Sequence, residues 1–498
     1  MTRLWPVALA ALLLAGCASG AGQGPSDEAS SVPVREIEGF RATPPGSGVD
    51  RYRDQSLDWR DCGQFQCAEV AVPLDWAEPD DHAITVSLLK RPAEHQPARG
   101  TVFVNPGGPG ASGKDLATSI ETTAFADHDV IGWDPRGAGS STPVRCGSDE
   151  DMDEYLSVDT SPDSPGEDEA LRAAAQEFAD RCVEESGRLL QHISTVDTVA
   201  DLDLLRHLVG EEKLNFLGFS YGTEIGAVYA ATHPDRVGHM VLDSPVSLEP
   251  DPPVPQIVGF ERAFENFAQW CAEMDCGLGV DRPAVTANVV DLLRQLDAEP
   301  LDVDGRRLTE SVAVSGMLLP LYQTEEYYPW LAEALTDARA GDGRALLELA
   351  DHYHERGPDG QYGQLLTSFA AIRCVSEPRV SVDEARKRQQ RDEQRTPVLG
   401  ELVGPDYECP VWGVPPTPNP TDYTATGDAP ILVIGARLDS ATPYENAVTM
   451  AETFQSAILV TWDGAGHGTY GGTSTCIDDA VAQYFRDDLP PDGLTCTP

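Results

Sequence analysis

Residues 214–234, LNFLGFSYGTEIGAVYAATHP, contain the turn that decides the fold. A short apolar run ends in Gly218-Phe219-Ser220-Tyr221-Gly222, and a helical pattern follows at once. In a G-x-S-x-G sequence between a strand and a helix, the glycines let the backbone turn sharply and the serine oxygen is exposed at the turn. The sequence therefore predicts that Ser220 is a nucleophile at a helix amino terminus. The amide of Tyr221 is expected to stabilise an oxyanion there.

Further apolar runs on both sides of this turn predict an α/β fold with a mostly parallel central sheet. Two opening strands are expected at 68–76 and 83–93. Six short runs follow, mostly separated by helix-length segments, at 101–104, 129–134, 214–219, 239–243, 430–435 and 457–462. Short continuous apolar runs of this kind are typical of strands buried on both faces.

The long interval between the fourth and fifth of these runs is mostly helical in pattern and is expected to form a cap. Its helical stretches include 260–274, 327–339 and 343–357. We therefore divide the folded part of the chain into a first core segment at 51–247, a helical cap at 248–425 and a second core segment at 426–498.

A second oxyanion donor is expected in the glycine-rich loop that follows the run at 101–104. That loop is Asn105-Pro106-Gly107-Gly108-Pro109-Gly110. Consecutive glycines allow backbone amides to approach a substrate carbonyl without obstruction from side chains. We predict that the Gly108 amide is this donor.

A serine nucleophile needs a base to remove its proton and an acid to orient that base. Asp439 lies just after the run at 430–435, and His467 lies just after the run at 457–462. The chain order serine, aspartate, histidine at successive strand ends matches one known arrangement of a catalytic triad. Asp463 and Asp243 are alternative acids, and Asp243 is the stronger of the two because it ends the strand after the Ser220 helix.

Composition and charge exclude several classes of protein. The chain has 498 residues, 41% of them hydrophobic and 23% charged, which is typical of globular proteins. With 35 basic and 82 acidic residues, its formal net charge is −47. A nucleic-acid backbone would be repelled, so no nucleic-acid partner is expected. The excess of acidic residues is interpreted as a solvated surface.

The first residues have the pattern of an export signal. Residues 1–17 contain Arg3, an apolar stretch too short to span a bilayer, and Leu14-Ala15-Gly16-Cys17, which resembles the bacterial lipobox. Cys17 is therefore expected to carry lipid that anchors the protein to the membrane, outside the cytoplasm; a plain signal peptide with secretion is the alternative. Residues 18–50 are rich in Gly, Ser, Pro and Ala and are predicted to be a flexible tether.

Eleven cysteines are present, and setting Cys17 aside leaves an even number, as expected for disulfides in an exported chain. Pairing near neighbours predicts the disulfides 62–67, 146–182, 271–276, 374–409 and 476–496. No metal site is expected, because neither short cysteine pair has zinc-site spacing. His352 and His354 are two residues apart on a predicted helix, so they would point in different directions, and both are interpreted as surface residues.

Five motifs together resemble one family. They are NPGGPGASG (105–113), GWDPRGAGSS (132–141), FLGFSYGTEIG (216–226), ARLDSATPYENA (436–447) and GAGHGTYGG (464–472). The chain, from about Cys62 to Cys496, is similar to the exported actinobacterial α/β-hydrolases of the tripeptidyl and prolyl aminopeptidase group.

This resemblance implies an α/β-hydrolase core with a helical cap, no metal or organic cofactor, and peptide substrates cut near a free amino terminus. It gives the triad roles to Ser220, Asp439 and His467, and the oxyanion amides to Gly108 and Tyr221. Asp134 and Arg136 match a family segment that is more often structural.

An aminopeptidase must bind a positively charged α-amine, and a buried carboxylate provides the opposite charge. Glu224 and Glu377 are the candidates; Glu377 lies near Cys374, where similar family members carry an acid. Glu325 and Glu326 are further possibilities. Family members often have an uncharged residue at position 224, so peptide length and residue preference stay open.

Two other functions fit parts of the sequence. The same triad hydrolyses carboxylic esters, because esters and amides share a tetrahedral intermediate. A tethered lipoprotein can also be a solute-binding protein, which would have no use for the three triad residues in this order. Whether one or three residues leave per cut, and the oligomeric state, are not determined by the sequence.

Overall fold

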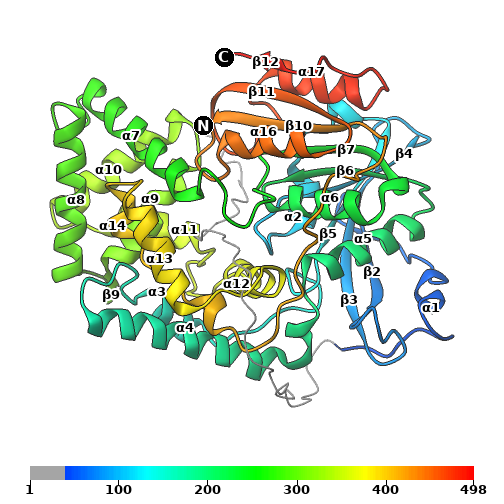
Figure 1. Cartoon of the computed structure of the whole chain (residues 1–498), viewed down its shortest axis with the longest axis horizontal. Helices are drawn as coiled ribbons and strands as arrows, with labels where there is room; N and C mark the ends of the chain where they lie inside the picture. Colours follow the sequence, from blue (N-terminus) through cyan, green and yellow to red (C-terminus); the bar gives the residue numbers. More distant parts are fainter. Residues whose placement is uncertain (1–39) are drawn as a thin grey trace.

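The computed structural model describes residues 40–498, and within that range the central sheet has ten strands (Figure 1). Neighbouring strands follow in this order: β1 (Arg60–Cys62), β2 (Phe65–Pro73), β3 (Ala83–Arg91), β5 (His128–Asp134), β4 (Gly100–Asn105), β6 (Leu214–Phe219), β7 (Val237–Asp243), β10 (Ile431–Leu438), β11 (Ala457–Ala465) and β12 (Leu494–Cys496). Pairing is antiparallel from β1 to β5 and parallel from β5 to β12. The predicted mostly parallel sheet is confirmed, with the two opening strands on its antiparallel side.

The central parts of the parallel strands are mainly apolar because both faces of the sheet are covered there. In β4, Phe103 packs into one core while Val102 and Val104 pack into the core on the opposite face. Successive side chains of a strand point to opposite faces, so a strand covered on both sides has no polar face to leave exposed.

Helices cover each face of the sheet. The larger core involves α1 (Asp50–Arg53), α3 (Asp149–Leu156), α4 (Pro165–Ser186), η2 (Gly187–Gln191), α5 (Thr195–Leu208), α6 (Tyr221–Thr232) and α16 (Tyr444–Thr453). The opposite core involves α2 (Gly113–Ser119), η1 (Thr123–Phe125) and α17 (Thr475–Tyr484). The short η3 (Pro234–Arg236) joins α6 to β7.

The segment expected to be a cap has a hydrophobic core of its own, and its helices α7 to α11 lie to one side of the sheet in Figure 1. Its elements are α7 (Gln256–Met274), α8 (Arg282–Ala298), β8 (Leu301–Val303), β9 (Arg306–Leu308), α9 (Glu310–Leu321), η4 (Glu325–Tyr327), α10 (Tyr328–Arg339), α11 (Arg344–Tyr353), α12 (Leu365–Ser376), α13 (Val382–Glu393), α14 (Leu399–Leu402) and α15 (Glu408–Val411). The β8–β9 hairpin was not expected from the sequence. Helix α12 contacts both cores, through Leu366 on the sheet side and Phe369 on the cap side.

All five disulfides predicted from neighbouring cysteines are present in the structure. They join Cys62 to Cys67, Cys146 to Cys182, Cys271 to Cys276, Cys374 to Cys409 and Cys476 to Cys496. No helix among residues 40–498 combines the length and apolar character that crossing a bilayer requires.

The predicted signal segment 1–17 and the lipidation residue Cys17 lie outside the described residues, as does most of the tether predicted at 18–50. At the end of that tether, the amide of Arg41 donates to the carbonyl of Ala83 at 2.9 Å. The chain is therefore joined to the sheet from Arg41 onward, before the predicted boundary at residue 50.

The interpretation of His352 and His354 as surface residues is wrong for His354, which directly follows α11. His352 is exposed, whereas His354 is only 6% exposed and packs edge-on against the ring of Tyr353. Burial lowers the pKa of His354 to about 4, so this imidazole is neutral in the fold.

Candidate active site

Ser220 occupies the sharp turn between β6 and α6. Its φ of 53° lies in the left-handed region, and its amide donates to the carbonyl of Asp243 at 3.1 Å. Glycines flank it because the backbones are very close: a Cβ on Gly218 would lie 2.5 Å from the carbonyl oxygen of Gly222, and one on Gly222 would lie 2.7 Å from that of Asn105. The predicted strand, turn and helix around Ser220 is confirmed.

Asp439 and His467 come together beyond the ends of β10 and β11. Nδ1 of His467 lies 3.0 Å and 3.1 Å from the two carboxylate oxygens of Asp439. The carboxylate also accepts hydrogen bonds from the amides of Ala441 and Thr442 at 2.9 Å and 2.8 Å, and from the Thr442 hydroxyl at 3.0 Å. This buried carboxylate is therefore held in place on several sides and is oriented toward the imidazole.

The environment of His467 favours its cationic form. Burial alone would lower its pKa, but the charge and hydrogen bond of Asp439, together with the charge of Asp243, outweigh burial and raise the pKa above its usual value. A base of this kind is stabilised once it has accepted a proton.

The two alternative acids have other contacts. Asp243 accepts hydrogen bonds from the amides of Thr469 and Tyr470, at 2.9 Å and 2.7 Å, and so binds the loop that carries His467. Burial raises the pKa of Asp243 to about 6. Asp463 lies on β11 and forms an ion pair with Arg437 at 3.0 Å. Of the three aspartates, only Asp439 hydrogen-bonds to the imidazole within the described residues.

Ser220 Oγ and His467 Nε2 are both buried and have no hydrogen-bond partner among residues 40–498. Ser220 is only 1% exposed. The ring of Tyr322, just after α9 in the cap, packs at 5.6 Å between centroids against the His467 ring. The cap therefore covers the side of the site where the histidine lies.

The glycine-rich loop after β4 approaches the Ser220 turn closely. Gly107 and Gly108 have φ angles of 96° and 104°, and a Cβ on Gly107 would lie 2.8 Å from the amide nitrogen of Tyr221. Only glycine allows this approach without strain. Gly108 and Tyr221 both line one cavity, and their roles as oxyanion donors stay predictions.

That cavity, here called the Gly108 cavity, has a volume of about 130 Å³ and runs between the sheet core and the cap. Its lining includes Gly108, Tyr221, Glu224, Val246, Val254, Phe369, Arg373, Ser376, Glu377 and Thr442. A second cavity of similar volume, here called the Tyr423 cavity, shares Glu224, Glu377, Ser247 and Ser376 with it. Glu224 and Glu377 therefore stand at the boundary between the two cavities.

Glu224 lies one helical turn after Ser220 on α6. Its Oε1 accepts a hydrogen bond from the Asn419 side-chain amide and another, at 3.1 Å, from the Thr195 hydroxyl. Burial and the nearby charge of Glu377 raise the pKa of Glu224 to about 7, although both hydrogen bonds act in the opposite direction. Thr195 and Asn419 were not predicted, because neither belongs to a motif and both reach Glu224 only through the tertiary fold.

Glu377 directly follows the last residue of α12, and Arg373 lies one turn earlier on that helix. The Arg373 guanidinium is buried and binds Asp406 and Glu408, at 2.5 Å and 2.9 Å. Burial would lower the pKa of Arg373, but Asp406, Glu377 and Glu408 raise it well above its usual value, so it stays charged.

Glu325 and Glu326 are exposed and line neither the Gly108 cavity nor the Tyr423 cavity. The structure therefore brings Glu224 and Glu377 to the candidate site and leaves these two candidates outside it.

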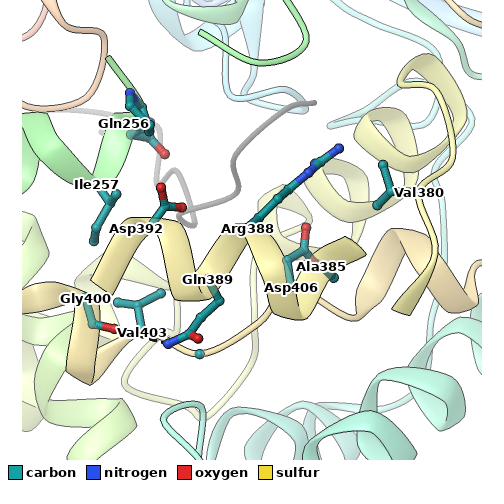
Figure 2. A pocket seen from close by; sticks show the side chains of 12 residues that line it. Gln256, Ile257, Val380, Ala385, Arg388, Gln389, Asp392, Gly400, Val403 and Asp406 are labelled. Atoms are coloured by element: carbon teal, nitrogen blue, oxygen red, sulfur yellow. Dashed lines mark hydrogen bonds between the residues drawn. The ribbon is translucent and has the colours of Figure 1, made fainter. Parts of the chain in front are cut away.

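A third, smaller cavity of about 50 Å³ lies within the cap, above α13 (Figure 2). Figure 2 shows Gln256 and Asp392 pointing toward one another across it. It shares Gln256 with the Gly108 cavity and Arg388 with the Tyr423 cavity. The third cavity therefore adjoins each of the other two.

Arg136, which the sequence placed outside the site, is a structural residue. Its guanidinium is fully buried and binds both carboxylate oxygens of Asp201, at 2.7 Å and 2.6 Å, as well as several backbone carbonyls.

A serine at a strand-to-helix turn and an aspartate–histidine pair beyond later parallel strands define the class of α/β serine hydrolases. Residues 100–471 match the family model described as alpha/beta hydrolase fold, and the chain belongs to this family.

Three similar proteins extend this assignment. Serine protease Hip1 of Mycobacterium tuberculosis (strain ATCC 25618 / H37Rv) is 34% identical over 89% of this chain and 91% of its own length. Tripeptidyl aminopeptidase of Streptomyces lividans is 31% identical over 91% of this chain and 87% of its own. Carboxylesterase B of the same M. tuberculosis strain is 32% identical over 88% of this chain and 90% of its own. The resemblance to the tripeptidyl aminopeptidase group is thus confirmed, and the protein is a serine hydrolase.

Proposed function

We propose that this serine hydrolase is an aminopeptidase that releases tripeptides or single residues from the free amino terminus of a peptide. One observation carries the proposal: Glu224 and Glu377 line the same cavity as Gly108 and Tyr221, the two predicted oxyanion residues. A peptide whose carbonyl lies at those amides can therefore direct its amine toward two carboxylates.

In the proposed reaction, Ser220 Oγ attacks the peptide carbonyl while His467 Nε2 takes its proton. Asp439 holds the imidazole and stabilises its cation, and the Gly108 and Tyr221 amides stabilise the oxyanion of the tetrahedral intermediate. The histidine then protonates the leaving amine, which leaves an acyl-enzyme on Ser220. Water activated by the same histidine releases the short peptide.

The charges around the cavity support recognition of an ammonium group. An α-ammonium has only donors to offer, and carboxylates are its strongest acceptors. Glu377 and Glu224 interact electrostatically, which disfavours ionisation of both at once. Binding of a cation between them relieves that repulsion, so a free amine is favoured over an acylated one.

Hydrolysis of carboxylic esters is the second candidate function. Val246, Val254 and Phe369 give the Gly108 cavity an apolar side that accommodates an acyl chain. One of the similar proteins is named Carboxylesterase B. An esterase would not depend on Glu224 or Glu377, and this difference separates the two functions.

The deciding experiment compares a fluorogenic tripeptide amide with its amino-acetylated twin, using the purified protein. Cleavage restricted to the free-amine form is the expected result. Equal cleavage of the twins, or ester hydrolysis with no peptide cleavage, would exclude the aminopeptidase. Replacing Glu377 with Gln should reduce the preference for the free amine. Hydrolysis of a small uncharged ester should be unchanged in this variant, which would show that the catalytic groups still work.

We also propose that the protein is exported and held at the membrane by lipid on Cys17. The five disulfides support an oxidising compartment. Mass spectrometry of the amino-terminal peptide should find an acylated Cys17 as the first residue. In Cys17→Ala, the lipid-anchored form should disappear from the membrane fraction, and the protein should be found in the medium or as the precursor with its signal uncleaved. An unmodified Cys17 in the mature chain would contradict the anchor.

A further inference from the structure

A buried hydroxyl group outside the residues assigned so far joins the two sides of the proposed amine site. Thr195 is the first residue of α5 and is 0% exposed. Its Oγ1 lies 2.7 Å from the phenol oxygen of Tyr221, 3.1 Å from Oε1 of Glu224 and 3.1 Å from Oγ of Ser376. Three elements, α5, α6 and the end of α12, therefore meet at one hydroxyl.

The backbone of Thr195 adds a further bond to the same place. Its amide donates to Oγ of Ser376 at 2.9 Å, and Ser376 directly precedes Glu377. Thr195 thus contacts Glu224 directly, and it contacts the residue adjacent to Glu377 twice.

The direction of these hydrogen bonds follows from the number of protons. A hydroxyl has one proton to donate and two lone pairs that accept. Burial and the charge of Glu224 raise the pKa of the Tyr221 phenol well above its usual value, so the phenol keeps its proton and donates it to Thr195. An ionised Glu224 can only accept, so the Thr195 proton is directed to that carboxylate.

We propose that Thr195 is a positioning residue for the amine site: its hydroxyl orients Glu224 as the ionised acceptor and ties it both to Tyr221, beside the nucleophile, and to the end of α12 that carries Glu377. This inference rests on the proposed aminopeptidase function. It assigns Thr195 to recognition of the substrate amine, with no direct part in breaking the scissile bond.

Loss of the hydroxyl should weaken binding of the amine more than it slows the chemistry. Thr195→Val has nearly the same shape and keeps the amide bond to Ser376, but it removes the donor to Glu224. A hydrogen bond to a charged group accounts for a roughly ten- to hundredfold difference in affinity. KM for a free-amine tripeptide amide should rise by about that factor while kcat changes little.

The pH profile gives a second readout. The charged and titratable groups that face Glu224 or line its two cavities are Tyr221, Glu249, Arg373, Glu377, Arg388 and Tyr423. A hydrogen bond to the ionised carboxylate lowers its pKa, so removing the bond raises the pKa of Glu224. In Thr195→Val, the acidic limb of kcat/KM for the free-amine substrate should therefore move to higher pH.

The chain offers a matched control on the same helix. Thr198 is 1% exposed, and its hydroxyl has no hydrogen-bond partner among the described residues. Thr198→Val therefore makes the same chemical change in an equally buried place and should leave KM, kcat and the pH profile unchanged. Thr195→Ser keeps a hydroxyl and should retain most of the affinity for the free amine. If Thr195→Val folds poorly, Thr195→Ala replaces it, and the same rise in KM is expected.

Each variant should be assayed on the tripeptide amide, its acetylated twin and p-nitrophenyl acetate, beside Glu224→Gln. The inference is supported if Thr195→Val raises KM for the free-amine substrate alone, if Thr195→Ser returns KM toward the wild-type value, and if Thr198→Val leaves KM unchanged. If Glu224→Gln raises KM but Thr195→Val does not, or if Thr195→Val lowers ester hydrolysis equally, the positioning role is wrong although the aminopeptidase stands. If neither Glu224→Gln nor Glu377→Gln alters the free-amine preference, the two carboxylates are not the amine site and the role of Thr195 is wrong as well. Equal cleavage of the tripeptide amide and its acetylated twin by the wild type would instead overturn the proposed function.

Discussion

Asp243, the last residue of β7, accepts a hydrogen bond of 2.7 Å from the backbone amide of Tyr470, three residues after His467. The carboxylate binds the amide and hydroxyl of Thr469 as well. One buried side chain at the end of a central strand thus holds the loop that carries the predicted base.

Asp243→Ala should therefore reduce activity without removing any reacting group. The Thr469 and Tyr470 amides would lose their acceptor, which costs about 1–3 kcal/mol for each buried donor left unpaired. We expect a lower kcat and a lower Tm, with KM for the peptide nearly unchanged, because the substrate amine binds elsewhere. Steady-state kinetics and calorimetry check this, and a variant with wild-type kcat would show that Asp243 does not position the loop.

The triad itself makes a sharper prediction. Ser220→Ala should abolish turnover and labelling by a fluorophosphonate probe while Tm stays close to the wild-type value, because a small side chain is removed. Asp439→Asn should keep the fold and lower kcat by about 10³–10⁴, since the amide no longer orients and stabilises the imidazolium. Retention of activity by Ser220→Ala would refute the assignment.

The dependence of substrate binding on pH should show the ionisation of Glu224 at the acidic end of the range. Its pKa is raised to about 7, and an ammonium is bound by the ionised form, so protonation below that pH should weaken binding. KM for a free-amine peptide should rise as pH falls from about 8 to about 5.5, by roughly tenfold per unit well below the pKa. Glu224→Gln should remove this part of the pH dependence. p-Nitrophenyl acetate provides the comparison, since it carries no amine and its KM should not show this part of the pH dependence.

The disulfide between Cys374 and Cys409 should contribute more stability than the one between Cys271 and Cys276. The first closes a sequence separation of 35 residues and the second one of 5. Loop entropy predicts losses of about 4 and about 2 kcal/mol when each pair is replaced by serine. Denaturant unfolding compares them, and mass spectrometry of the unreduced mature protein should find no free thiol in any of the five pairs.

The sequence predicted that Asp439 and His467 lie together because each follows a short apolar strand, and these two strands are parallel neighbours in the sheet. The turn at Ser220 was predicted from its local pattern of strand, glycines and helix, and the catalytic roles of Ser220, Asp439 and His467 stay predictions. Glu377 could be predicted only through family resemblance, since a glutamate at the end of a helix carries no local signal of its partner. Contacts between side chains of separate elements could not be predicted from the sequence. Thr195 contacts Glu224 only because α5, α6 and α12 come together in the fold. The burial of His354 likewise depends on how α11 packs against the rest of the cap. The local sequence around His352 and His354 carries no information about that packing.

Glu310, at the start of α9, should make the protein less stable as pH rises. Burial is the main cause that raises its pKa to about 7, and oxygen atoms of Asp159, Asp297 and Glu310 all lie within 4.8 Å of one another. A carboxyl whose pKa is higher in the folded state binds more protons there than in the unfolded chain. Its contribution to stability is therefore greatest below its unfolded pKa of about 4.3 and is lost as pH rises to about 7.

Glu310→Gln removes this ionisation and keeps an oxygen that can accept from Ser161, which donates to Oε2 of Glu310. The variant should gain about 1–3 kcal/mol over the wild type at pH of about 8, and little or nothing at pH of about 4. Ser119→Ala, on the surface helix α2, is a control that should show no such pH-dependent difference. If the free energies of unfolding of Glu310→Gln and the wild type change in parallel across this pH range, the pKa of Glu310 does not differ between the folded and unfolded states.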